Sequence, residues 1–358
     1  MREDEGAHRG AGPRERVHRR ARRAPPARRP TMIDVANEAR VSQTTVSLVL
    51  NHADGARLSA ETRERVVKAA ASLGYQQVRR GFAPGAAAAS IGFICDEIST
   101  DPWTAIGLDG VREKAWERGL TVMVMATRGD ADMESAALAQ LTAQPLVGLI
   151  YATINTRLID ASAALLATPT VLLNCHVANG ALPSVVPGEV AGGHAATDVL
   201  IRAGHRRIGY VNGEASMEAS RHRLRGYRQA LATADLPFDP DLVREGNWQP
   251  ISGYDATREL MNLKSPPTAV FCANDLMAVG CYEALHGLGL RIPDDVAVMG
   301  YDDREIAQHL HPPLTTVLLP HFEMGSIATE ILLDAASGSL SRPRQIKVEC
   351  PIVRRGSV

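Results

Sequence analysis

Apolar and polar residues change their spacing twice along this chain of 358 residues. Residues 1–30 hold almost no large apolar side chain, so they offer no pattern that could form a core. Residues 31–75 place apolar residues three and four positions apart, which is the spacing of one helix face. From residue 90 onward, short apolar runs alternate with amphipathic segments, which predicts strands alternating with helices.

The alternating region predicts parallel sheets with helices on both faces. Strands are expected at residues 91–95, 121–125, 147–151, 170–173, 208–211, 268–272 and 296–301, and helices at 104–118, 190–202, 220–232 and 276–286. Roughly 270 residues of this pattern exceed one doubly wound sheet, so we expect two lobes. The first would comprise about residues 90–187 plus 317–340, and the second about 188–316 plus 341–355.

The helical region predicts two short helices joined by a very tight turn at Arg40 and Val41. Thr31 and Asp34 have the spacing of a capping box at the start of the first helix, and Ser42 can cap the second. The residues expected to face inward are Val35, Ala36, Ala39, Val46, Val49 and Leu50, followed by Val66, Ala70 and Leu73 of a third helix that begins at Ser59. Two helices crossing at so tight a turn predict a helix-turn-helix.

In a helix-turn-helix, the start of the second helix enters the major groove of DNA, which would place Gln43, Thr44 and Ser47 at base edges. Glutamine bonds adenine in a bidentate manner, whereas threonine and serine are less selective. Ser42 and the neighbouring amides would hold a phosphate at the helix start. The alternative is a plain three-helix bundle whose polar residues are solvated surface.

Several motifs in a fixed order make the chain resemble the lactose-repressor (LacI/GalR) family of bacterial transcription regulators. In the head they are IDVA (33–36), VS (41–42), TVS (45–47), LN (50–51), TRERV (62–66) and LGY (73–75). In the body they are CANDLMA (272–278), GYDD (300–303) and PPLTT (312–316), so the resemblance covers about residues 31–355. It implies a helix-turn-helix headpiece on a two-lobed α/β body similar to periplasmic sugar-binding proteins.

With this resemblance, we expect residues 1–30 to be a disordered basic tail, 31–78 the DNA-binding domain, 79–89 a hinge or linker, and 90–355 the effector-binding and dimerisation body. The residues expected to contact DNA are Thr31, Ser42, Gln43, Thr44, Thr45, Ser47, Asn51, Tyr75, Arg79, Arg80 and Phe82.

The chain departs from the family pattern at three places. Arg40 stands where the family usually has glycine, which would cost roughly 1 kcal/mol if the backbone is left-handed there. Leu48 takes a slot that often holds a base-reading arginine. Gly81 and Pro84 break the hinge-helix pattern, so we expect that helix to be short or absent, with Phe82 as a substitute minor-groove wedge.

The net charge of −1 conceals an uneven distribution. Residues 1–80 hold 17 basic and 9 acidic side chains, and the remainder hold 22 and 31. A basic head on an acidic body suits a polyanion partner, although a solvated basic tail without a partner is the alternative. Most of the excess lies in residues 1–30, so the spacing and identity of side chains support DNA binding more than charge does.

The composition argues against several classes of protein. No apolar run of 18 residues predicts a membrane span, and the Arg-rich start lacks the apolar core of a secretion signal, so we expect a cytoplasmic protein associated with the nucleoid when bound to DNA. Five separated cysteines suggest reduced thiols and neither disulfides nor a zinc site. The motifs of nucleotide-binding loops, zinc proteases and serine hydrolases are missing, so we expect no enzyme, cofactor or metal.

Polar side chains just after the expected strands define a candidate effector site, because parallel sheets bind ligands at the carboxyl ends of their strands. The candidates are Asp101, Trp103, Asn174, Arg221, Arg223, Trp248, Asn274 and Asp302. Carboxylate, amide and guanidinium groups beside a flat indole suit a carbohydrate. Each has a structural alternative: Trp248 in a core, Asp302 as a helix cap, and either arginine in a surface ion pair.

These features predict a homodimeric transcriptional repressor that binds a pseudo-palindromic DNA operator and responds to a small molecule, a sugar or sugar derivative, held between the lobes. Whether the effector releases or promotes DNA binding is left open. A solute-binding protein without a regulatory role would share the body, and a sugar-active enzyme would need a carboxylate pair or nucleophile that the sequence does not offer.

Overall fold

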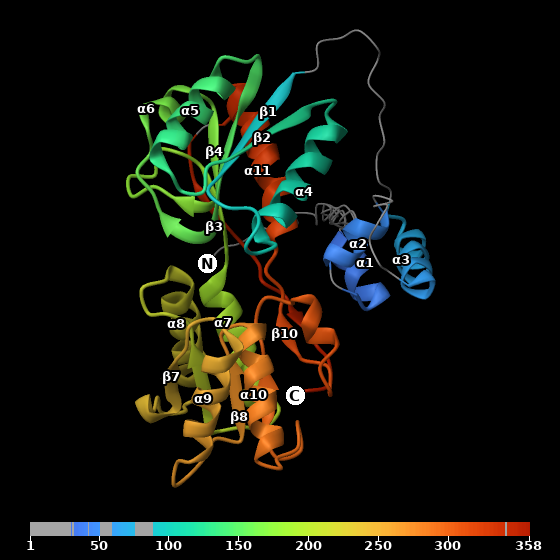
Figure 1. Cartoon of the computed structure of the whole chain (residues 1–358), viewed down its shortest axis with the longest axis vertical. Coiled ribbons are helices and arrows are strands. Elements are labelled where there is room, and N and C mark those ends of the chain that lie inside the picture. The colour runs from blue at the N-terminus through green and yellow to red at the C-terminus, as the bar shows by residue number, and fades with distance from the viewer. Residues whose placement is uncertain (1–29, 31, 42, 51–58, 76–88, 341) are drawn as a thin grey trace, which may run out of the picture.

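The computed structural model describes residues 30, 32–41, 43–50, 59–75, 89–340 and 342–358. In these residues the expected fold class is confirmed: a three-helix headpiece accompanies a body of two α/β lobes with parallel sheets (Figure 1). The predictions of a disordered tail and of a broken hinge helix fall on residues outside the described ones.

The headpiece consists of α1 (Met32–Ala39), α2 (Gln43–Leu50) and α3 (Ala60–Leu73). Its core holds the apolar residues that the helical spacing placed inward, except that Leu50 and Leu73 are only partly buried. Arg40, between α1 and α2, has a φ of +53°, so the turn does require the left-handed backbone that glycine adopts most easily. The α3 helix begins as expected, because the Ser59 hydroxyl accepts a hydrogen bond from the Thr62 amide at 3.1 Å.

The first lobe contains a six-stranded parallel sheet with the strand order β11-β5-β4-β3-β1-β2. The strands are β1 (Ser90–Cys95), β2 (Thr121–Ala126), β3 (Leu146–Leu158), β4 (Thr170–His176), β5 (Ser184–Pro187) and β11 (Gln345–Val348). The helices are α4 (Trp103–Glu117), α5 (Ala131–Thr142), α6 (Ala163–Ala167) and α11 (His321–Ala336). Side chains of β1 alternate between two cores: Phe93 packs with residues of α4 and α11, and Ile94 packs with residues of α5 and α6.

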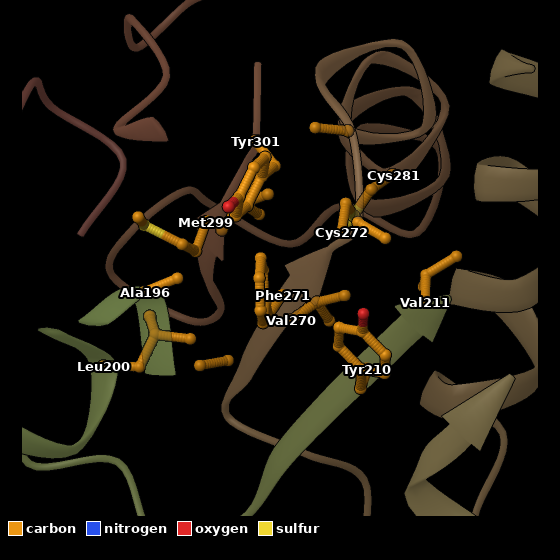
Figure 2. Packing of buried hydrophobic residues seen from close by; sticks show 14 of the residues in the cluster. Ala196, Leu200, Tyr210, Val211, Val270, Phe271, Cys272, Cys281, Met299 and Tyr301 are labelled. Atoms are coloured by element: carbon orange, nitrogen blue, oxygen red, sulfur yellow. The ribbon is translucent and has the colours of Figure 1, made fainter. Parts of the chain in front are cut away.

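The second lobe contains a four-stranded parallel sheet with the order β7-β6-β8-β9. Its strands are β6 (Ile208–Asn212), β7 (Val243–Glu245), β8 (Ala269–Cys272) and β9 (Ala297–Met299); its helices are α7 (Glu189–Arg202), α8 (Glu218–Thr233), α9 (Pro250–Met261) and α10 (Asp275–Gly287), with short 3-10 turns at Pro240–Leu242 and Glu305–Gln308. Figure 2 shows part of its core, with Tyr210 and Phe271 among the labelled side chains. The centre of the Tyr210 ring lies 5.0 Å from the ring centres of both Tyr227 and Phe271.

Three described segments join the lobes. The chain passes from β5 into α7, from β10 (Thr316–Val317) into α11, and from β11 to β12 (Ile352–Val353), which pairs with β10. The assignment of residues 341–355 as a whole to the second lobe was wrong, because β11 extends the first sheet by pairing with β5. The β11 strand lies at the edge of the sheet and alternates between exposed and partly buried residues, so its sequence lacks the apolar run that would have predicted its pairing with β5.

Candidate effector and DNA-binding sites

A cavity of 380 Å³ lies between the two lobes, at the carboxyl ends of their strands. It is lined by residues near the carboxyl ends of β3 and β4 and by residues that follow β8 and β9. The starts of α4, α7 and α11, the α8 helix (Glu218–Thr233) and the loop before α9 complete the lining. A cavity of this volume is in the range of small-molecule binding sites.

Arg223 on α8 is a deeply buried charged group of this cavity, with 3% of its surface exposed. Its Nε and Nη2 donate to the two carboxylate oxygens of Glu189, the first residue of α7, at 2.8 and 2.9 Å. The guanidinium group also lies 3.7 Å from the centre of the Tyr301 ring. Burial alone would lower the pKa of Arg223, but Glu189 and Asp302 reverse this effect and raise it above the ordinary value, so the charge persists.

Glycines allow Glu189 and Arg223 to meet, because they bring α7 and α8 into backbone contact. A Cβ atom on Gly193 would lie 2.5 Å from the Arg223 carbonyl oxygen, and one on Gly226 would lie 2.3 Å from the Val190 carbonyl oxygen. Any larger residue would push the helices apart and separate the two charged groups.

Asp302 follows β9 and connects both arginines of the cavity. Its Oδ1 lies 3.3 Å from Nη1 of Arg223, and its Oδ2 lies 3.7 Å from Nε of Arg304. Burial raises the pKa of the Asp302 carboxyl to about 7, although both guanidinium groups act to lower it. The sequence had also allowed Asp302 as a helix cap; in the structure it faces the cavity, and its backbone has a φ of +111°.

One wall of the cavity is a stack that joins the lobes. The Trp103 ring, at the start of α4, lies 5.2 Å from the His321 ring at an interplanar angle of 21°, and the Arg304 guanidinium lies 5.0 Å from the Trp103 ring centre. Arg304 also forms an ion pair with Asp101 of the first lobe. Burial lowers the pKa of His321 to about 4, so its imidazole is neutral at pH 7.

Asn274 shapes the site mainly by supporting its neighbours. It is the N-cap of α10, where its Oδ1 accepts from the Met277 amide at 2.8 Å. Its Nδ2 donates to the Trp248 carbonyl at 3.0 Å, which fixes the loop that presents the indole ring. The indole lies against Gly213, where a Cβ atom would come within 2.0 Å of the ring, and its Nε1 has no hydrogen-bond partner within the described residues.

Asn174, at the end of β4, plays a similar part in the first lobe. Its Nδ2 donates to the carbonyls of Thr153 and Ile154 at 2.9 and 3.0 Å, and its Oδ1 accepts from the Thr156 hydroxyl. These bonds hold β3 where its pairing with β4 is interrupted. Asn174 therefore lines the cavity, but its side-chain amide is mainly used in hydrogen bonds to Thr153, Ile154 and Thr156 of β3.

The structure brings together seven of the eight predicted effector residues: Asp101, Trp103, Asn174, Arg223, Trp248, Asn274 and Asp302. Arg221 was wrong as a cavity residue, because its side chain is exposed and donates to the carbonyls of Ala215 and Ser216. The sequence reasoning missed Glu189, Arg304 and His321. Arg304 stands two residues after Asp302 and could have been inferred, whereas Glu189 follows a strand that the apolar pattern did not reveal.

No group of three or more histidine, cysteine or acidic side chains among the described residues is arranged to hold a metal ion. The described helices also include none that is long and apolar enough to cross a membrane.

Family models match the chain in two parts. Residues 31–77 match bacterial regulatory proteins of the lacI family, and residues 197–358 match the periplasmic binding protein-like domain. The chain is 33% identical to the ribose operon repressor of Haemophilus influenzae over 92% of this chain and 98% of that protein. It is 31% identical to the transcriptional repressor PurR of Aliivibrio salmonicida over 92% of this chain and 98% of that protein. The chain belongs to the LacI family.

Solved structures of LacI-family regulators agree with this assignment. The regulator CelR in complex with cellobiose superimposes with a TM-score of 0.64 at 32% identity, covering 92% of this chain and all of that one. The Lac repressor dimer bound to operator and the anti-inducer ONPF gives 0.63 at 29% identity, covering 92% of this chain and 99% of that one. The protein is therefore a DNA-binding transcriptional repressor with an effector site.

The LacI headpiece places Gln43, Thr44 and Ser47 within α2, the second helix of the helix-turn-helix. Thr45 was predicted to contact DNA, but its side chain is buried with 4% exposed, which argues against a direct contact. The other predicted contacts at Thr31, Ser42, Asn51, Arg79, Arg80 and Phe82 lie outside the described residues.

Tyr75 was also expected at the DNA, but here it joins the headpiece to the body. Its hydroxyl donates to Oε1 of Glu113 on α4 at 2.6 Å. Phe322 of α11 packs into the headpiece core nearby. In this arrangement Tyr75 is engaged with the first lobe, so a DNA contact by Tyr75 would require the headpiece to leave this position.

Proposed function

We propose that the protein is a homodimeric repressor whose affinity for a pseudo-palindromic operator is controlled by a sugar or sugar derivative bound in the cavity between the lobes. Residues 31–78 would form the DNA-binding domain and residues 79–89 the linker that transmits the state of the body. We propose a regulatory and not an enzymatic role, exercised in the cytoplasm on the bacterial nucleoid.

The observation that supports this proposal best is the polar cavity itself, in the same chain as a helix-turn-helix. Asp302 and Trp248 meet in it from separate elements and offer an acceptor and a flat apolar surface, next to the buried guanidinium group of Arg223. Hydroxyl groups on a ring need such a combination. The complex of CelR with cellobiose and the name of the ribose operon repressor are consistent with a carbohydrate effector.

Effector control requires that the ligand bind one arrangement of the lobes better than another. The stack of Arg304 on Trp103 and the ion pair of Arg304 with Asp101 connect the lobes across the cavity, so a ligand there changes the contacts between them. A dimer would present two recognition helices to two half-sites about one or more DNA turns apart.

Footprinting of the full-length protein on genomic DNA tests the regulatory role. We expect protected sites with two half-sites, and a lack of any protected site would favour the alternative of a solute-binding protein without a regulatory role.

A thermal-shift screen against sugars, sugar phosphates and nucleosides tests the effector. We expect a stabilising compound whose effect is lost in Asp302→Ala and kept in Asp255→Ala, a control that removes an exposed carboxylate of α9 in the same lobe. If both variants respond like the wild type, the ligand binds elsewhere.

A further inference from the structure

The guanidinium group of Arg223 already makes four hydrogen bonds within the protein. Its Nε and Nη2 are bonded to Glu189 in a fork-to-fork pair, and its Nη1 donates to the Ala273 carbonyl and approaches Asp302 at 3.3 Å. A phosphate or carboxylate on a ligand would need the same two forked N–H groups that Glu189 occupies. Glu189 is 3% exposed and sits in the first turn of α7, so its carboxylate also takes the place of an anion at that helix start.

The charges of the residues that line the cavity also disfavour an anionic ligand. The charged residues among those that line it are Asp101, Glu189 and Asp302 against Arg223 and Arg304. The formal charge is therefore −1 with Asp302 ionised and zero with Asp302 protonated, and His321 adds none because burial lowers its pKa to about 4. In neither state is there an excess of positive charge to offset an incoming anion.

The starts of helices are the remaining attraction for an anion, since each carries a partial positive charge. At α10 this is used by the protein, because the Asn274 side chain accepts from the Met277 amide. At α7 the Glu189 carboxylate fills that role. The partial positive charges at the other helix starts that line the cavity are smaller than the full negative charge that Glu189 contributes.

We propose that Glu189 determines the specificity of the effector site by acting as a built-in counter-anion, so that the cavity takes neutral polyhydroxylated ligands and excludes phosphorylated or carboxylated ones. This inference rests on the proposed effector site and narrows its ligand class. The cavity suits such a ligand: a hydroxyl can donate to Oδ2 of Asp302, which lies 3.7 Å from Nε of Arg304, and the Trp248 side chain also lines the cavity.

The first test uses inorganic phosphate as the probe, at constant ionic strength, with full-length protein and isothermal calorimetry. We compare the wild type with Glu189→Gln, which keeps the size of the side chain and removes its charge. Glu349→Gln is the matched control, because it removes an exposed carboxylate that does not line the effector cavity. We expect no saturable binding of phosphate by the wild type or the control. We expect Glu189→Gln to bind phosphate at least tenfold more tightly than the upper limit set by the wild type, and this binding to be lost when Arg223→Met is added.

The second test compares ribose with ribose 5-phosphate and glucose with glucose 6-phosphate on the wild type. In any pair that binds, we expect the phosphorylated sugar to bind at least tenfold more weakly than its neutral parent. In Glu189→Gln we expect this difference in affinity to become smaller. Circular dichroism verifies the fold of each variant, and Glu189→Asn is a second neutral variant to use if the Gln protein does not fold.

The inference is overturned if wild-type protein binds a phosphorylated sugar as tightly as its neutral parent, or if a folded neutral variant gains no affinity for phosphate. Failure of the proposed sugar effector would look different: no neutral sugar would bind in either pair, while the phosphate experiment would still decide the role of Glu189.

Discussion

Replacing Gly226 by alanine tests whether the close approach of α7 and α8 positions the charged pair of the effector site. The new Cβ would meet backbone atoms at three points: 2.3 Å from the Val190 carbonyl oxygen, 2.6 Å from the His194 amide nitrogen and 2.9 Å from the Gly193 carbonyl carbon. Backbone cannot rotate away as a side chain can, so the helices must separate by roughly 1 Å to restore ordinary contact.

Overpacking of this kind costs about 1–3 kcal/mol, and the better helix propensity of alanine returns up to about 1 kcal/mol. We therefore expect Gly226→Ala to lower the free energy of unfolding by about 1–2 kcal/mol. We also expect weaker effector binding, because Glu189 on α7 and Arg223 on α8 move apart. Denaturant titration of the full-length protein measures the first effect, and ligand-induced thermal shift measures the second.

Gly287→Ala is the matched control, since it adds the same atom to a helix residue with no neighbour within 4 Å of the new Cβ. We expect this variant to be unchanged or up to about 1 kcal/mol more stable. The reasoning is refuted if Gly226→Ala is as stable as Gly287→Ala and binds effector like the wild type.

Three further predictions concern single side chains. Arg40→Gly should stabilise the headpiece by about 1 kcal/mol, because φ is +53° there, and hydrogen exchange of α1 to α3 should slow; unchanged exchange would contradict this. Burial raises the pKa of Asp302 to about 7, so the folded protein binds its proton more tightly than the unfolded chain. This contribution to stability is present below pH 4 and is lost as the pH rises to 7, and Asp302→Asn should reduce that decline in unfolding titrations. Gln43→Ala should shift base preference in operator-binding assays, whereas Arg79→Ala should weaken all sequences alike and lower the salt slope by about 1.

The sequence predicted well those features that depend on neighbouring residues. Apolar spacing identified the three headpiece helices and the main strands, because burial of one face imposes a local period. The family resemblance also pointed to Arg40, because glycine is usual at that position, and the structure shows the left-handed backbone there. In the body, the positions after the strands identified most of the cavity, because parallel strands bring their carboxyl ends to one edge.

The sequence could not show which polar groups pair across the fold. Arg221 and Arg223 lie on the same helix and have the same chemistry, yet one is exposed and the other is buried against Glu189, 34 residues earlier. Arg304 pairs with Asp101 across 203 residues, and β11 joins the first sheet although it carries little apolar pattern.

By itself, the sequence determined the class of the protein: a helix-turn-helix headpiece on two parallel α/β lobes, with a polar site where the strands end. Only the tertiary structure decided the chemistry of that site, because a guanidinium group is available to a ligand or already bonded within the protein according to which distant carboxylate reaches it. The contact of α7 with α8 brings Glu189 to Arg223, and with it the preference for an uncharged effector that we propose.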